Sequence, residues 1–196
     1  MSELFRARAG VVHSLMNVLN KQPTEKTQQL LTKLRGGPVD KIVRLPGIGW
    51  VDEADFVGVI DVCHRELGDI EYPRVIHAAS MVMLKTGIVR AARAASDVFV
   101  KASVGGYARW TPRIWNLCFQ GLQLEYVDRT DDTIRMYLKQ PPAGKFTRSI
   151  VLGAAGIVQS VFTLARKAGT VTPAPFRERD ERVVLLLQKE SIARSA

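Results

Sequence analysis

Histidines are the first residues to consider for chemistry, because an imidazole can act as a general base or as a metal ligand. The sequence has three, His13, His64 and His77, and no cysteine lies near them at a metal-ligand spacing. His77 falls on a largely apolar helical stretch and is the one candidate ligand for a haem or a metal. A single histidine in that setting is more often a hydrogen-bonded residue of the core or its boundary, and we favour that interpretation.

Nucleophilic catalysis also lacks its usual patterns. Ser149 and Ser160 fall inside an apolar helical stretch without a Gly-x-Ser-x-Gly elbow. The glycines at 105 and 106 lack the lysine–serine pair of a phosphate-binding loop. A group of aspartates falls at a predicted hairpin turn, where turn formation explains it: Asp128, Asp131 and Asp132. We find no catalytic constellation and predict that the protein is not an enzyme.

The stretch Leu-Pro-Gly-Ile-Gly at 45–49 matches the hairpin of helix-hairpin-helix DNA-binding motifs, in which glycine amides approach a phosphate. The residues that follow argue against this role. Asp52, Glu53 and Asp55 would stand where the phosphate binds, and like charges repel it. A tight turn with Trp50 packed beside it is the favoured interpretation.

The segment 107–115 places two arginines among three aromatic residues, a pattern that could stack bases or hold an anionic ligand. More often, aromatic residues in such a segment anchor a short helix to a sheet while the arginines face solvent, and we favour that interpretation. Further basic residues just upstream fall on one helical face. The competing prediction of a nucleic-acid-binding protein therefore rests on Arg90, Arg93, Lys101, Arg109 and Arg113.

Composition sets the broad class. The 196 residues suffice for one domain with an appendage, and 46% hydrophobic residues suffice for a sizeable core. The net charge of +9 suits an anionic partner or simply favours solubility.

Cys63 and Cys118 have apolar neighbours, which predicts buried thiols and no structural zinc. We find neither a signal peptide nor a run of about 18 apolar residues for a membrane span, and expect a cytoplasmic protein.

The stretch from 122 to 188 organises the predicted fold. Apolar and polar residues alternate in two β-hairpins, at 122–140 with a turn at Asp131-Asp132, and at 169–189 with a turn at Arg179-Asp180. Between them, residues 145–169 repeat apolar side chains at helical spacing and stop at Gly169. Gly153 and Gly156 lie three apart, which predicts close packing against a neighbour. We expect an α+β fold in which this helix crosses a four-stranded antiparallel sheet.

The residues upstream read as helices. We expect an amphipathic helix over 2–20, a second over 25–35 capped by Thr24, an extended piece over 41–45, and helices over 51–66, 73–86 and 88–103. Gly105-Gly106 would end the last of these, and a short helix would begin near Pro112. The domain prediction is a helical arm over 1–40, an α+β domain over 41–189 and a flexible tail over 190–196.

Three stretches carry a resemblance to a known superfamily: GIGWVDEADFVGVID at 47–61, RWTPRIWN at 109–116 and VLGAAGIVQSVFTLARKAG at 151–169. With the order of elements, they resemble the heme-NO-binding-like and four-vinyl-reductase-like superfamily, whose architecture the TRAPP vesicle-tethering subunits share. More narrowly, the chain resembles an uncharacterised paralogous family abundant in myxobacteria. The resemblance implies bacterial small-molecule sensing or protein interaction, commonly as a homodimer.

The same resemblance bears on cofactors. Haem-binding members carry a histidine and a Tyr-x-Ser-x-Arg signature, which this sequence lacks, and zinc-binding members use cysteines that it also lacks. We therefore expect no cofactor. The leading prediction is a non-enzymatic regulatory module that binds a small apolar ligand or a partner protein. Its pocket would lie between sheet and helices, lined by Trp110, Trp115, Met136 and Phe162.

Overall fold

The computed structural model describes residues 5–22, 24–86, 89–91, 94, 103–130, 133–139 and 145–190. In chain order, their elements are β1 (Arg6–Arg8), α1 (Ala9–Lys21), α2 (Glu25–Leu34), α3 (Pro38–Ile42), β2 (Trp50–Asp52), α4 (Glu53–Met83), α6 (Val104–Cys118), β3 (Phe119–Gln120), β4 (Gln123–Arg129), β5 (Thr133–Lys139), α7 (Arg148–Val158), α8 (Ser160–Ala165), β6 (Gly169–Pro173) and β7 (Arg182–Lys189). The predicted turn at Asp131-Asp132 and most of the predicted helix 88–103 lie outside the described residues.

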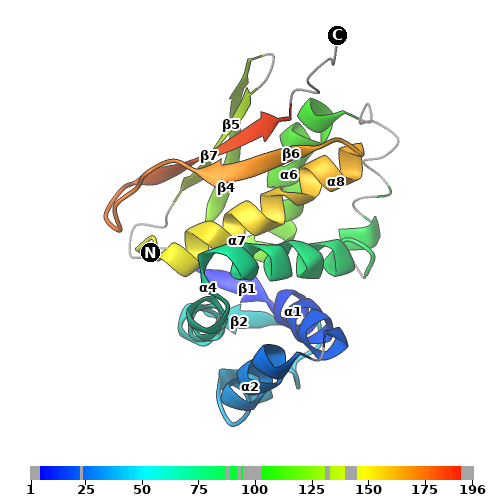
Figure 1. Cartoon of the computed structure of the whole chain (residues 1–196), viewed down its shortest axis with the longest axis vertical. Coiled ribbons are helices and arrows are strands. Elements are labelled where there is room, and N and C mark those ends of the chain that lie inside the picture. The colour runs from blue at the N-terminus through cyan, green and yellow to red at the C-terminus, as the bar shows by residue number, and fades with distance from the viewer. Residues whose placement is uncertain are drawn as a thin grey trace.

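The two C-terminal hairpins form the predicted four-stranded antiparallel sheet, in the order β4-β5-β7-β6. On the central strands β5 and β7, every second side chain is buried, so the apolar alternation of the sequence becomes one buried sheet face. That face is covered by α7, as Figure 1 shows. The predicted α+β fold class is therefore confirmed.

The helix expected over 145–169 forms as two helices, α7 and α8, separated at Gln159. The Gln159 side chain donates to the carbonyl of Gly169 over 2.8 Å and accepts from the amide of Val171 over 2.9 Å, which ties the break to β6. The predicted end at Gly169 is wrong. Helix α8 ends at Ala165 because Arg166 adopts the left-handed conformation, with φ of 51°.

Helix α4 has two arms that meet at Gly68, whose φ of 77° and ψ of 177° lie outside the helical region. The sequence predicted separate helices over 51–66 and 73–86, whereas Pro73 lies within the second arm. This arm crosses α7 at the predicted glycines. A Cβ on Gly156 would lie 2.5 Å from the carbonyl oxygen of Pro73, so close helix packing is confirmed.

The N-terminal segment differs most from its prediction. Residues 6–8 form β1 rather than helix, and β1 pairs with both β2 and β3 in a small sheet of order β2-β1-β3. Phe5 and Ala7 are buried with the rest of the core. Strand β1 thus joins strands that are far apart in the sequence. The division into a helical arm over 1–40 and a domain over 41–189 stays a prediction.

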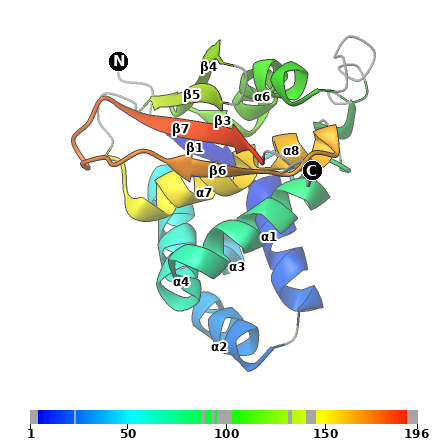
Figure 2. The same ribbon diagram turned by 45° about the horizontal axis from the view of Figure 1, so that its top comes forward.

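Two further predictions upstream need comment. The extended piece expected over 41–45 is wrong, since α3 begins at Pro38, which suits a first helical turn. Helix α2 and its cap are confirmed: Thr24 and Thr27 form a reciprocal capping box. In Figure 2, the helices α1 to α4 lie on one side of α7 and the larger sheet lies on the other.

Helix α6 begins earlier than predicted. Ser103 caps it by accepting from the amide of Gly106 over 3.0 Å, so Gly105-Gly106 open this helix rather than end the preceding one. A Cβ on Gly105 would lie 2.9 Å from a guanidinium nitrogen of Arg129 on β4, a flexible side-chain end that can move aside. Trp110 and Trp115 lie on α6, on the side of the molecule where α4 and α7 meet.

One stretch corrects the sequence prediction on membrane spans. Residues Arg148–Ala165, which form α7 and α8, are long and apolar enough to cross a membrane by composition. They lie between the sheet and α4, and 67% of the stretch is buried inside the protein. Burial of this kind is typical of a core helix, which is apolar on all sides.

Candidate ligand-binding site

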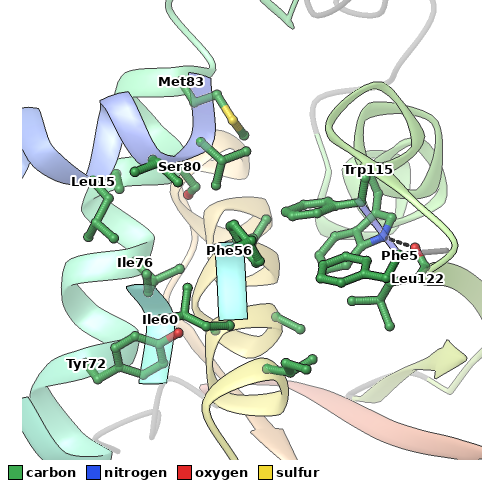
Figure 3. Close-up of a pocket in the computed structure, with 18 residues that line it drawn as sticks. Phe5, Leu15, Phe56, Ile60, Tyr72, Ile76, Ser80, Met83, Trp115 and Leu122 are labelled. Atoms are coloured by element: carbon green, nitrogen blue, oxygen red, sulfur yellow. Dashed lines mark hydrogen bonds between the residues drawn. The ribbon is translucent and has the colours of Figure 1, made fainter. Parts of the chain in front are cut away.

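A buried apolar cavity lies where α1, both arms of α4, α6 and α7 converge (Figure 3). Its volume is about 40 Å³, enough for a few water molecules. One water requires about 10–15 Å³ by that measure. The 18 lining residues are Phe5, Val11, Val12, Leu15, Phe56, Ile60, Tyr72, Ile76, Ala79, Ser80, Met83, Trp115, Phe119, Leu122, Ile150, Gly153, Ala154 and Ile157.

Aromatic rings form one wall of this inner cavity. Phe5 and Phe56 meet edge to face with centroids 5.6 Å apart, and Trp115 lies 4.4 Å from Phe119. The indole nitrogen of Trp115 donates to the carbonyl of Leu122 over 2.6 Å, which holds the ring in place (Figure 3). Such a wall is rigid, because each ring is fixed by its neighbours.

The polar groups of the lining are already satisfied. The Tyr72 hydroxyl donates to the carbonyl of Ser149 over 3.1 Å, and the Ser80 hydroxyl donates to the carbonyl of His77 over 2.8 Å. Complete burial raises the pKa of Tyr72 well above its usual value, so its hydroxyl stays protonated. The inner cavity can therefore bind a molecule by desolvation and dispersion, with little demand for hydrogen bonds.

A second apolar pocket adjoins the first between α6 and α8. The two pockets share Ser80, Met83, Trp115, Phe119 and Ile157. Met83 is buried, and its sulfur lies 3.7 Å from the sulfur of Cys118. A methionine has an unbranched, adaptable side chain, so Met83 can adjust the passage between the two spaces.

The predicted pocket residues are only partly brought together. Trp115 lines both pockets and Trp110 lines the second. Met136 on β5 and Phe162 on α8 are fully buried, but neither lines the pockets found among the described residues. The sequence analysis did not predict that α1 and α4 line the inner cavity. Their apolar stripes are visible in the sequence, but such a stripe is found equally on a packed core helix and on a cavity wall.

Three basic residues of the nucleic-acid prediction lie among the described residues: Arg90, Arg109 and Arg113. Arg109 lies 5.5 Å from the ring centroid of Tyr126, and Arg113 lies 5.4 Å from that of Trp110. Arg90 is exposed. Arg93 and Lys101 lie outside the described residues. The two described arginines of α6 thus cover aromatic rings at the surface.

None of the three histidines lines the inner cavity. His13 hydrogen-bonds the carbonyl of Ile42 and His64 pairs with Asp69. His77, the candidate ligand, is half-buried, and its Nε2 lies 3.0 Å from the hydroxyl of Thr163. Burial lowers the pKa of His77. It is thus a boundary residue with a hydrogen-bond partner, as the sequence favoured.

The lowered pKa of His77 predicts a pH effect on stability. The unfolded chain binds a proton at His77 more readily than the folded protein does, so the free energy of unfolding falls as pH drops below about 6.5. The contribution of His77 to the free energy of unfolding is fully present at pH 8. Hydrogen bonds from Arg148 and His64 lower the pKa of Asp69, so its contribution is lost only at much lower pH.

We therefore expect His77→Gln to lose less stability than the wild type between pH 7 and pH 5. Urea denaturation at several pH values measures this difference. Parallel pH profiles for the two proteins would contradict the assignment.

Both cysteines are buried free thiols, as predicted. Burial raises the pKa of Cys63 and of Cys118 to about 12, so neither is a thiolate at neutral pH. Among the described residues, no group of three His, Cys, Asp or Glu side chains could hold a metal ion.

No protein-family model matches the sequence, and no curated protein matches it either. Solved structures do match. The Fe(II) unliganded H-NOX protein from K. algicida has a TM-score of 0.63 at 9% identity, over 95% of this chain and 98% of that one. The chain has the H-NOX fold. A variant of the Tt H-NOX protein gives a TM-score of 0.58 at 10% identity, with 94% and 95% covered.

An oxygen-binding H-NOX domain related to soluble guanylate cyclases, solved as its oxygen complex, gives a TM-score of 0.56 at 9% identity, over 94% of this chain and 95% of that one. These likenesses support the heme-NO-binding-like part of the predicted resemblance. At this identity, the H-NOX fold is what the chain shares with them.

Haem features in studies of the H-NOX family, so its fit to this cavity can be tested. Haem iron takes an axial His, Cys, Met or Tyr ligand. All three histidines and both cysteines of the sequence are described, and none lines the inner cavity. Tyr72 and Met83 do line it, but the Tyr72 hydroxyl is held by a carbonyl and the Met83 sulfur contacts the Cys118 thiol. No Arg or Lys among the lining residues faces the carboxylates that a haem carries. The lining does not fit a haem.

Proposed function

We propose that the protein is a non-enzymatic regulatory module that binds a small apolar molecule in the inner cavity. The observation that carries this proposal is the nearly complete absence of free polar groups among the lining side chains of the described residues. An isolated apolar cavity is a defect in packing unless a ligand fills it, because its lining loses dispersion contacts. The H-NOX fold, with a small-molecule complex known for one neighbour, supports the same conclusion.

The position of the cavity suggests how binding would be transmitted. Its walls include Phe5 at the start of β1, Ile76 on the second arm of α4, and Ile157 on α7. A ligand would therefore contact the helical half and the helix that covers the sheet at once. An occupant that prefers one relative arrangement of these elements shifts their equilibrium by its difference in affinity.

Benzene is a suitable first probe, because a dry apolar cavity of about 150 Å³ accepts it. The inner cavity alone is smaller, so benzene would also occupy part of the adjoining pocket beside Met83. A ligand at ten times its Kd would stabilise the fold by about 1.4 kcal/mol, which raises Tm by roughly 2–4 °C for each kcal/mol. We expect a saturable increase in Tm for the wild type. Ala79→Leu, which places a larger side chain in the cavity, should remove that increase.

Ala78→Leu is the matched control, since Ala78 neighbours Ala79 on α4 but lines neither described pocket. It should respond to benzene as the wild type does. No response in any of the three proteins would overturn the proposed function.

Two narrower parts of the proposal concern the cellular compartment and the protein partners of the chain. The free buried thiols of Cys63 and Cys118 suit the reducing cytoplasm. A homodimer or another protein partner remains a prediction, and native mass spectrometry of the purified chain tests it. The competing nucleic-acid function also remains a prediction, because no specific contact of the described arginines favours it.

A further inference from the structure

A wide groove opens beside the inner cavity, between the start of α1, the loop before β2, and the ends of α4 and α6. The volume of this groove is about 560 Å³. Its polar lining includes Arg8, His13, Ser14 and Asn17, and none of the lining residues is acidic. The groove is therefore much larger than the inner cavity and is positively charged.

Arg8 is held rigidly at this groove. Its guanidinium lies 3.6 Å from the ring centroid of Trp50, donates from Nε to the carbonyl of Leu117 over 3.3 Å, and donates from Nη1 to the carbonyl of Ile48. These two bonds use two of its five N–H donors. Among the described residues, no carboxylate lies within ion-pair distance of Arg8, whereas its strand neighbour Arg6 pairs with Asp52 at 3.3 Å. Arg8 thus keeps free donors and an uncompensated charge.

Ser14 supplies a second, independent sign of a ligand. It lines the groove with only 6% of its surface exposed, and its hydroxyl has no hydrogen-bond partner among the described residues. An unsatisfied buried hydroxyl is costly and calls for a partner. A bound polar head group would supply one.

The remainder of the groove is apolar and leads inward. Val82 and Leu117 line it, and it shares Val11 and Met83 with the inner cavity. Met83 also lines the pocket between α6 and α8, so all three spaces meet at this side chain. A molecule with its charged end at Arg8 would therefore place an apolar body against Met83.

From this arrangement we infer that the groove binds an amphiphilic organic acid. Its anionic head would contact Arg8 and Ser14, and its apolar body would point toward Met83. The inference rests on the proposed function, since it names the chemical class of the ligand and its route of entry. A charged donor matched to a carboxylate and an apolar wall together distinguish such an acid from a neutral hydrocarbon.

Calorimetric titration at pH 8 with octanoate, 1-octanol and acetate tests the inference. We expect octanoate to bind at least about tenfold more tightly than 1-octanol, since a hydrogen bond to a charged group is worth about that factor. Acetate should bind far more weakly, because each buried methylene contributes about fourfold in affinity. Equal affinities for octanoate and 1-octanol would overturn the inference.

Two variants locate the site, with a matched control. Arg8→Gln should abolish the preference for octanoate over 1-octanol, while Arg6→Gln, which removes the same charge from the same strand, should retain it. Ser14→Leu keeps Arg8 but replaces the hydroxyl by a larger apolar side chain, so it should weaken octanoate binding. An equal effect of Arg6→Gln and Arg8→Gln would overturn the assignment.

Benzene binding in the same proteins separates this inference from the proposed function. If benzene binds to the inner cavity while octanoate shows no preference, the inference fails and the proposed function stands. If neither molecule binds to the wild type, both fail.

Discussion

Replacing Trp115 by alanine is expected to lower the free energy of unfolding by about 3–5 kcal/mol. Trp115 is 2% exposed, packs against Phe119 and donates to the carbonyl of Leu122. Its loss would enlarge two pockets that already adjoin, and would leave a buried carbonyl without its donor. Because the surrounding rings are held by one another, little relaxation can offset the new space.

Trp110→Ala is the control on the same helix. Trp110 is only partly buried and lies at the surface beside Arg113, so we expect a cost of about 1 kcal/mol. Urea denaturation of the two variants gives both values. Equal losses would show that Trp115 is not the anchor between α6 and the inner cavity.

Gly156→Ala is expected to lower the free energy of unfolding by about 2–3 kcal/mol, although alanine is the better helix former. The new Cβ would lie 2.5 Å from the carbonyl oxygen of Pro73 and 3.2 Å from the Cβ of Ile76. A backbone oxygen in α4 cannot turn aside as a flexible side chain can. The second arm of α4 would have to move away from α7, and the wall of the inner cavity would move with it.

Gly58→Ala in the first arm of α4 serves as the matched control. Its Cβ would meet only Pro38 Cγ at 3.7 Å, an ordinary contact. Here helix propensity should dominate, and we expect stabilisation of up to about 1 kcal/mol. A stabilised Gly156→Ala would contradict the close packing of α4 on α7.

The larger sheet and the helix that covers it could be predicted from the sequence because their signals are local. Alternation on β5 and β7, and the glycine pair on α7, report directly on burial and close approach. The small sheet could not be predicted in this way. Its strands have two or three residues each, too few to show a period, and they pair across about 110 residues of sequence, from Ala7 to Phe119.

The candidate site was harder to predict than the fold. Trp110 and Trp115 were recognised as aromatic residues near a pocket, and they do line one. Ile76 and Leu15 form the same apolar pattern whether they face a neighbour or an empty space. The kink at Gly68 decides which residues of α4 reach the cavity. The sequence predicted a break between two helices there, but a break alone does not show which face of each arm turns toward the cavity. Arg8 falls in the stretch 2–20 that was predicted to be a helix, yet it lies on a strand and lines the groove.

Isoleucine methyl resonances offer the most direct test of the central claim, that the inner cavity binds a small apolar molecule. Ile60 and Ile76 line this cavity and no other described pocket, whereas Ile134 is buried on β5 and lines none of them. In a titration of ¹³C-methyl-isoleucine protein with benzene, we predict saturable shifts of the Ile60 and Ile76 resonances and an unchanged Ile134 resonance. Unchanged Ile60 and Ile76 resonances, or equal shifts of all three, would contradict the account.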